Sequence, residues 1–509
     1  MSPRRASLSG GIALALAALG VPSNDAHACG GGFFTRPSEA EWTHVTGHRV
    51  VISMSTTQTV LWDQVQYYGD PSEFAWVLPV KPGARLEIGA DAWIEALDAA
   101  TTPVVHAPLV VCDLSDRSTD CGPQRVKQGE YIGPWPTDGS RATEQVTVVH
   151  SRAVGPYETY TLSADAEGAL DAWLTEHGFA IPEGARPVID DYVAQGFDFI
   201  AVRLRPTAGV DQMKPLRVVT PGLVTTFPLR MLSVGAKESV ALSVFVVAEG
   251  RIGVQNFPSA ALDPAELTWD FVEFRSDLPD VRAAALTPEG GEAPWLTSYA
   301  LGAPLLTPRQ GYELAGPDDM LVDTIADVYF TRGHANGDVA QACSSTSFEE
   351  AALGKDKVVE LCPADGAPCA EPGPGEADAR VFTCGDALDD LGVALVGLRP
   401  ADVWLTRLDA QLPVEALTDD LELTPGGMLT PPAAGEVSNH LFAEKGENAD
   451  PVCTPVSAQD SSDIAALHAP PRSPQGGRSR GFATSAACAA LVLGLGRRAT
   501  RRRRQTARS

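Results

Sequence analysis

The chain has 509 residues, which is too long for one ordinary domain, and 44% of them are hydrophobic, enough to build real cores. Its formal net charge is −26, although nine of its 39 basic residues lie near the two ends, namely Arg4, Arg5 and the seven arginines after Gly496. The rest of the chain is therefore more acidic still. Because such a surface repels phosphates, nucleic acid and anionic lipid are excluded as partners of the main body.

The first 28 residues have the three parts of a secretory signal peptide. Two arginines supply the charge, an apolar stretch covers 8–21, and Ala-His-Ala at 26–28 forms a small-x-small cleavage site. We therefore predict export, with cleavage between Ala28 and Cys29. A twin-arginine signal and a lipidated Cys29 remain alternatives, although the residues around both positions fit those signals poorly.

Strand-like segments follow the leader. β-Branched and aromatic residues, ended by turn signals, predict three strands, at 49–54, 59–68 and 74–80. Residues 90–100 instead place Trp93 and Leu97 on one face at helical spacing, which predicts a helix.

A second passage from strands to helices begins near residue 145. Alternating residues predict strands at 145–150 and 157–162, and helices are expected at 163–177 and 185–195, each followed by glycine. Four further strands are predicted, at 197–205, 216–220, 226–232 and 239–248. A strand-rich sheet with two or three helices packed against it is an α+β domain, and we place it at 29–254.

Residues 255–431 form the second expected region. Proline and glycine turns are frequent there, and isolated strands are predicted at 269–274 and 320–331. Four cysteines collect between 343 and 384. We therefore expect a mostly β region that depends on disulfides more than on a large core.

Cysteine parity supports an oxidising compartment. Without Cys488, which lies in a C-terminal apolar run, the mature chain holds eight cysteines, an even number. Cys112 and Cys121 flank a short polar loop and are the expected local pair, whereas lipidation of Cys29 would leave one thiol unpaired. The remaining candidates are Cys343, Cys362, Cys369 and Cys384, which we expect to pair within their group, and Cys453.

The C-terminal segments predict a membrane anchor. A Pro-, Ser- and Gly-rich linker at 432–480 precedes an uncharged stretch at 481–496 and an arginine-rich tail at 497–509. As a helix the stretch would span about 24 Å, less than the roughly 30 Å of hydrocarbon, and the flanking arginines would reach to the interfaces. The arginine excess places the tail in the cytoplasm and the main body outside. This layout resembles the C-terminal sorting signals of myxobacterial surface proteins, with a plain membrane tail as the alternative.

Four segments between 29 and 254 carry a family resemblance. They are CGGGFF from Cys29, GDPSEFAWVLPV from Gly69, LDAWL with GFAIP from Leu170, and YVAQGFDF from Tyr192. In order and spacing they resemble the bacterial family called domain of unknown function 2330. The resemblance implies an exported domain and assigns no chemistry. Family members often have a cysteine after the paired phenylalanines where Thr35 stands here, which makes a distant partner for Cys29, such as Cys453, an alternative.

No common catalytic motif occurs in the sequence. It has no Gly-x-Ser-x-Gly elbow, zinc-binding His-Glu-x-x-His, phosphate loop or Cys-x-x-Cys pair. His44 and His48 are separated by Gly47 in a strand-like segment, so we interpret them as exposed strand residues, and the other histidines are scattered singly. We interpret the pairs of acidic residues at 190–191, 318–319, 389–390 and 419–420 as solvated surface. The tryptophans that we interpret as core residues are Trp62, Trp76, Trp93 and Trp173.

These observations predict an exported protein of the cell envelope or cell surface, anchored in the membrane through 481–496. The favoured role is a non-enzymatic binding or structural module, and the alternative is an exported hydrolase whose site is not visible as a motif. Its enzymatic status stays open, and no catalytic, cofactor-binding or metal residue is assigned. Expected partners are the membrane and an envelope protein or surface glycan, not nucleic acid.

Overall fold

A computed structural model describes the central part of the chain. The described residues are 31–34, 44–69, 74–112, 150–162, 168–182, 184–205, 212–287, 294–302, 305–306, 309–310, 321–322, 324–341, 343–361, 368, 370–383, 389–425, 435–449 and 453–456. All belong to the first of two units, Met1–Ala458 and Gln459–Ser509. Within them no helix has the length and apolarity needed to cross a membrane. The expected leader, membrane helix and arginine-rich tail lie outside them.

The largest element is an eight-stranded mixed sheet in the order β15-β18-β23-β13-β2-β3-β11-β5. Strand β13 pairs in parallel with β2 and antiparallel with β23. The α+β class is thus confirmed, and segment 255–431 contributes three strands to this same sheet. The eight strands are β2 (His44–Met54), β3 (Gln58–Tyr68), β5 (Arg85–Ile88), β11 (Leu216–Pro221), β13 (Ala236–Glu249), β15 (Ser259–Ala260), β18 (Trp295–Gly302) and β23 (Val403–Pro413).

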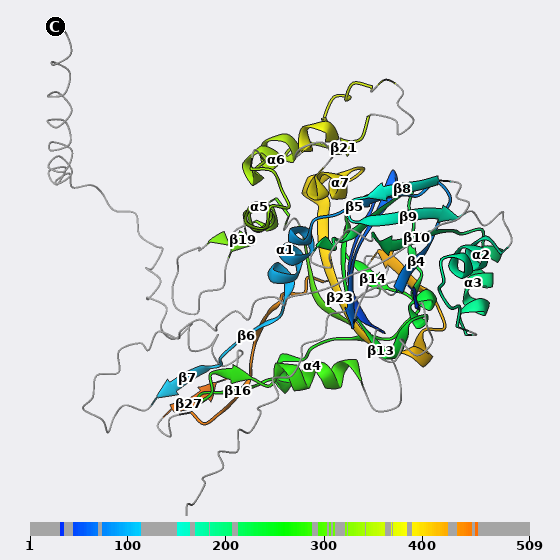
Figure 1. Cartoon of the computed structure of the whole chain (residues 1–509). Coiled ribbons are helices and arrows are strands. Elements are labelled where there is room, and N and C mark those ends of the chain that lie inside the picture. The colour runs from blue at the N-terminus through cyan, green and yellow to red at the C-terminus, as the bar shows by residue number, and fades with distance from the viewer. Residues whose placement is uncertain are drawn as a thin grey trace, which may run out of the picture. The chain divides into compact units, whose positions relative to one another are not determined.

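Helices cover one face of this sheet (Figure 1). Side chains from alternate strand positions, among them Trp62 and Phe245, pack against Trp93 and Tyr329 from the helices, and all four are fully buried. The expected core role of Trp62 and Trp93 is therefore confirmed. The covering helices are α1 (Asp91–Thr101), α5 (Ile325–Asn336), α6 (Ser345–Ala352) and α7 (Asp390–Leu395).

A five-stranded antiparallel sheet, in the order β1-β4-β10-β9-β8, packs against part of the other face. Trp76, Leu78 and Ile200 meet Val218 between the two sheets. The outer face is covered by two helices, and Trp173 of α2 packs against Tyr160 of β9, so α-helices form the outermost layers on both sides (Figure 1). These elements are β1 (Gly31–Phe34), β4 (Phe74–Val80), β8 (His150–Val154), β9 (Tyr157–Leu162), β10 (Asp198–Leu204), α2 (Ala169–Glu176) and α3 (Ala185–Ala194).

The part of the large sheet that the five-stranded sheet leaves uncovered is covered by a short sheet and a 3-10 helix. The sheet has the order β12-β24-β14, and its apolar residues Phe227 and Leu421 pack against Val244 and Leu408 of the large sheet. The elements are β12 (Thr226–Phe227), β14 (Ile252–Val254), β24 (Leu421–Pro425) and η3 (Leu229–Ser233).

The glycine-rich start of the family motif forms edge strand β1. The Gly32 N–H donates to the Val234 carbonyl at 2.7 Å, and Phe33 is fully buried. A Cβ on Gly235, which has φ +95°, would lie 2.7 Å from the Gly32 carbonyl oxygen. Because a real side chain does not fit at that distance, glycine is required where the two backbones meet.

Several expected elements differ from the structure. Of the strand predicted at 320–331 only β20 (Leu321–Val322) is present, and α5 follows, because Thr324 and Asp327 form a capping box. The strand predicted at 226–232 ends at Phe227, and η3 follows Pro228. Helix α2 begins at Ala169, while 145–149 and 163–167 lie outside the described residues.

Short strand pairs complete the described part. Beside the large sheets, β6 pairs in parallel with β25, and β7 pairs antiparallel with β27 (Figure 1). The remaining elements are β6 (Val104–His106), β7 (Leu109–Cys112), β16 (Thr268–Asp270), β17 (Arg275–Ser276), β19 (Arg309–Gln310), β21 (Lys357–Val359), β22 (Glu376–Asp378), β25 (His440–Phe442), β26 (Lys445–Glu447), β27 (Cys453–Val456), α4 (Leu278–Leu286), η4 (Pro264–Glu266), η5 (Ala379–Phe382), η6 (Pro400–Asp402) and η7 (Val414–Ala416).

The described cysteines bear on the expected disulfides. Cys343 is disulfide-bonded, and its Sγ lies 3.7 Å from the Thr383 carbonyl oxygen. Cys112 lies directly opposite Cys453 in the register of β7 and β27. Outside the described residues are Cys29, Cys121, Cys362, Cys369 and Cys384.

We predict that Cys112 pairs with Cys453. Residues directly opposite in an antiparallel pair have Cα atoms about 4.5 to 5.5 Å apart, which lies within the range that a disulfide bridges. Peptide mapping of the oxidised protein should find the two peptides linked, and the link should disappear on reduction. A peptide that joins Cys112 to Cys121 would contradict this prediction and support the local pair expected from the sequence.

Candidate functional site

A cavity of about 60 Å³ lies where the large sheet, the five-stranded sheet and the short sheet meet. Strands β2, β3 and β11 supply one wall, β4 the second, and the segment around β12 the third. The cavity is bordered by Ile52, Thr59, Leu61, Leu78, Pro79, Val80, Lys81, Phe197, Val218, Thr220, Val224, Thr225, Thr226, Phe227, Pro228 and Leu423. It is therefore built from segments far apart in the sequence.

The cavity is mostly apolar, and Lys81 alone carries a charge among the described residues that border it. Lys81 follows β4 directly and is half-buried, with its Nζ 3.6 Å from the centroid of the Phe197 ring. Burial lowers the pKa of Lys81, and the charge of Asp420 opposes that shift. The ammonium is thus partly desolvated and held over an aromatic face.

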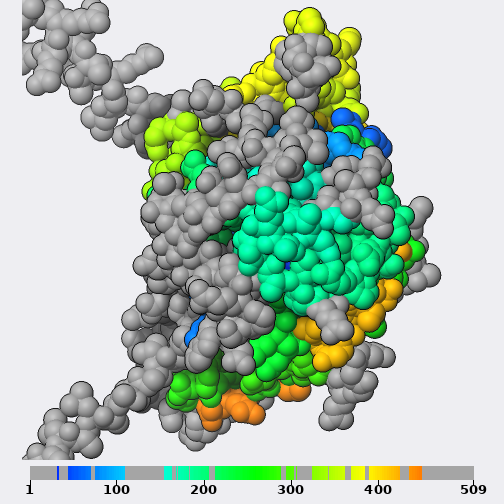
Figure 2. Space-filling view, turned by 45° about the vertical axis from the view of Figure 1, so that its right-hand side comes forward, coloured from blue at the N-terminus to red at the C-terminus, as the bar shows by residue number. Residues whose placement is uncertain are grey.

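The Asp420 carboxylate is committed elsewhere. Arg230 lies 3.1 Å from it, the Tyr192 hydroxyl donates to it, and the Arg230 guanidinium stacks over the Tyr192 ring at 4.7 Å. Asp420 is half-buried, unlike the solvated surface expected for 419–420, whereas Asp419, Asp190 and Asp191 are exposed as predicted. In Figure 2 the teal surface around α2 and α3 adjoins the gold surface of the segment near β24, where this cluster lies.

His48 and Asp63 form a buried pair on neighbouring strands. The His48 Nδ1 lies 3.5 Å from an Asp63 carboxylate oxygen, and both side chains are fully buried. The exposed position expected for His48 is thus wrong, because it points into the space between the sheets. Burial raises the pKa of Asp63 well above its usual range, so a neutral acid is favoured. Neither residue borders the cavity.

The pair Asp389 and Asp390, expected on the surface, is also buried, on the helix-covered face. The Asp390 carboxylate accepts from the Trp62 indole at 2.6 Å, from Arg217 at 2.7 Å and from the Ala90 N–H at 2.7 Å. It therefore fastens α7 to β3, β11 and the start of α1. Because all three donors belong to the protein itself, the Asp390 carboxylate has a structural role.

Asp389 is the N-cap residue of α7, and two hydrogen bonds hold its carboxylate. Its carboxylate accepts from the Leu391 N–H at 3.0 Å and from the Tyr329 hydroxyl at 2.7 Å. Burial, and after it the charge of Asp390, raises the pKa of Asp389 to about 7. Since an unfolded aspartate titrates near 3.9, the folded protein binds the proton more tightly, and stability falls as the pH rises from about 4 to about 7.

Asp389→Asn should remove this pH dependence, because asparagine is a good N-cap and stays neutral. The free energy of unfolding of the variant relative to wild type should rise by about 1.4 kcal/mol per pH unit inside that window. Urea unfolding between pH 4 and pH 8 measures it. Asp263→Asn, at the exposed N-cap of η4, is the matched control. Parallel pH curves for wild type and Asp389→Asn would contradict the prediction.

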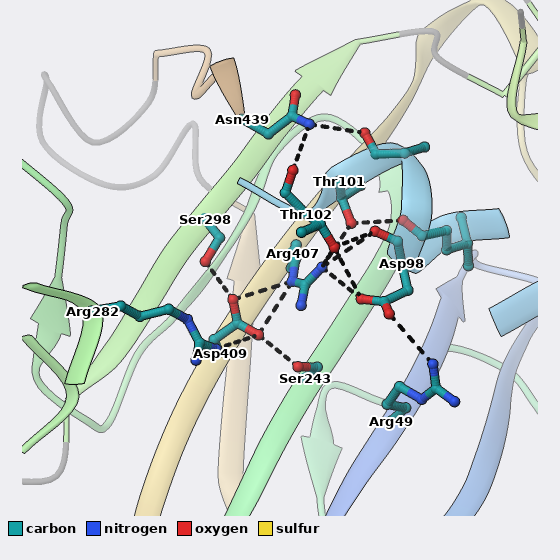
Figure 3. Close-up of polar contacts among 12 residues, drawn as sticks. Arg49, Asp98, Thr101, Thr102, Ser243, Arg282, Ser298, Arg407, Asp409 and Asn439 are labelled. Atoms are coloured by element: carbon teal, nitrogen blue, oxygen red, sulfur yellow. Dashed lines mark hydrogen bonds and ion pairs between the residues drawn. The ribbon is translucent and has the colours of Figure 1, made fainter. Parts of the chain in front are cut away.

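A second ionic cluster centres on Arg407 and Asp409 of β23 (Figure 3). Arg407 lies 3.1 Å from Asp409 and 2.8 Å from Asp98 of α1. The Asp409 carboxylate also accepts from Ser243 of β13 at 2.6 Å and from Ser298 of β18. Although burial alone would raise the pKa of Asp409, the arginine charges hold it below its usual value. Arg282 of α4 also lies 3.3 Å from Asp409, so the cluster joins three strands and two helices.

Asp409→Asn should destabilise the fold by about 3–5 kcal/mol, because Arg407 would lose its fully buried counter-charge. Thermal or urea unfolding measures the loss. Asp402→Asn is the control, since its pair with Arg399 at 3.1 Å is exposed and should contribute less than about 1 kcal/mol. Equal effects of the two substitutions would overturn the structural role of the cluster.

His106 and His440, scattered in the sequence, meet in the structure. Their rings stack with centroids 5.2 Å apart, and the Nε2 of one lies 2.9 Å from the Nδ1 of the other. Phe442 stacks on His106 at 4.9 Å. Across the described ranges no group of three or more His, Cys, Asp or Glu is placed to hold a metal ion. The two histidines join β6 to β25.

The fold and cavity define an α+β protein in which a small, mostly apolar cavity lies where three sheets meet, beside a lysine. The chain belongs to the family described as "Uncharacterized protein conserved in bacteria (DUF2330)", whose model matches residues 25–352. The match confirms the family resemblance and continues past 254, the expected end of the first domain, through α6. No curated protein and no solved structure matches the chain.

Proposed function

We propose that the protein is an exported, membrane-anchored component of the cell envelope or cell surface, and that its folded part binds a small ligand without transforming it. The observation that carries the binding role is the cavity beside Lys81, which is apolar and has one charged group at its border. Small-molecule sites are typically apolar, with few polar groups that orient the ligand.

The cavity favours binding over hydrolysis. A hydrolase needs a nucleophile beside a base, or paired carboxylates, at the place where substrate enters. The carboxylates with strongly raised pKa values, Asp63 and Asp389, do not border the cavity. The Lys81 ammonium contacts the Phe197 ring, and among described residues no threonine hydroxyl is hydrogen-bonded to it. A binding module therefore accounts best for this arrangement.

The proposed location is supported by the two ends of the sequence and by one cysteine. The leader at 1–28 and the apolar stretch at 481–496 followed by arginines are the signals for export and anchoring. Cys343 is disulfide-bonded, and disulfides are typical of exported proteins.

Fractionation tests this location. The native protein should be found with membranes, its intact mass should correspond to a chain that begins at Cys29, and a version truncated after residue 480 should become soluble outside the cytoplasm. A version truncated after residue 496 retains the apolar stretch and is the control. Recovery of the full-length chain in the cytosol with reduced thiols would contradict the proposal, and a diacylglycerol-modified Cys29 would replace the C-terminal anchor with a lipid anchor.

A further inference from the structure

We infer that the cavity binds a short aliphatic carboxylate of about four to six carbons, with its chain between the sheets and its carboxylate at the Lys81 ammonium. This inference rests on the proposed binding function and specifies its ligand class.

The size of the cavity limits the apolar part of the ligand. A volume of about 60 Å³ accommodates roughly four to six water-sized groups, at about 10–15 Å³ for each. A sugar ring would also bring hydroxyl groups that the Ile52, Leu78 and Val218 side chains cannot satisfy. A short unbranched or branched alkyl chain fits both the volume and the lining.

Lys81 determines the charge of the ligand. Its ammonium is partly desolvated, its described contact is the Phe197 ring, and no ion pair or hydrogen bond joins it to a described residue. Asp420, whose charge opposes the lowering of the Lys81 pKa by burial, is engaged by Arg230 and Tyr192. A carboxylate beside the Lys81 ammonium would supply a partner for a charge-assisted hydrogen bond.

Hydrogen bonds hold one wall of the cavity, the segment between β11 and β12, in place. The Thr59 hydroxyl donates to the Gly222 carbonyl at 3.0 Å and accepts from the Val224 N–H at 2.7 Å, which fixes the loop between β11 and β12 against β3. Because these hydrogen bonds already hold the segment in place, little ordering cost opposes binding. The strong acidity of the chain further disfavours ligands with several negative charges.

Isothermal titration calorimetry on the mature full-length protein in neutral detergent tests the inference with hexanoate, hexan-1-ol and dodecanoate at pH 7.5. Hexanoate should bind at least about tenfold more tightly than hexan-1-ol, because only the carboxylate pairs with Lys81. Dodecanoate should bind more weakly than hexanoate, since its chain exceeds the cavity. The affinity for hexanoate should decrease with added salt.

Two variants and a control separate the possible results. Lys81→Met should abolish the preference, so that hexanoate binds this variant no more tightly than hexan-1-ol does, and Lys237→Met, at an exposed lysine, should keep the wild-type preference. Val224→Trp should fill the cavity and block both ligands, with unfolding temperature as the check on folding. Equal wild-type affinities for hexanoate and hexan-1-ol would overturn the carboxylate while leaving the cavity as a binding site. Failure of all three ligands to bind would overturn the proposed binding function itself.

Discussion

The pairing of β13 with β2 on one side and β23 on the other is the constraint on which the structure depends. Residues of β13 alternate between two cores, since Phe245 packs beneath the helices and Val244 and Val246 face the short sheet. The parallel pairing requires a close approach, because a Cβ on Gly47 would lie 2.3 Å from the Ala241 carbonyl oxygen. Without β23 the strand would lose one row of backbone hydrogen bonds, so the two halves of the chain stabilise each other.

Two buried ionic clusters attach helices to the large sheet. Arg217 with Asp390, and Arg407 with Asp409, lie on the helix-covered face and satisfy each other in buried positions. Replacing one partner of such a pair is costly, whereas the intact pair fixes the arrangement of the strands and helices it joins. Lys81 differs from these residues because its charge is not matched by a contacting carboxylate among the described residues, which is why it stands out as a site for a ligand.

Local patterns predicted most strands and helix α1, since alternation and helical spacing depend only on neighbouring residues. Helix α5 was missed because Val328, Tyr329 and Phe330 favour strands, although the capping signal at Thr324 and Asp327 was present in the sequence. The burial of Asp389 and Asp390 could not be predicted from local patterns, since Trp62, which donates a hydrogen bond to Asp390, lies 328 residues away in the sequence. The cavity could not be predicted from the sequence either, because its walls are strands that come together only in the folded protein.

The strand order has a consequence for the rate at which the protein forms. The central strands of the large sheet come from 44–54, 236–249 and 403–413, and each must find partners more than 150 residues away. Loop closure of that length makes such a topology slow to fold, with unpaired strand edges exposed in the meantime. The sheet cannot be completed until β23, which ends at Pro413, can pair, so the earlier strands must be kept from aggregating until then.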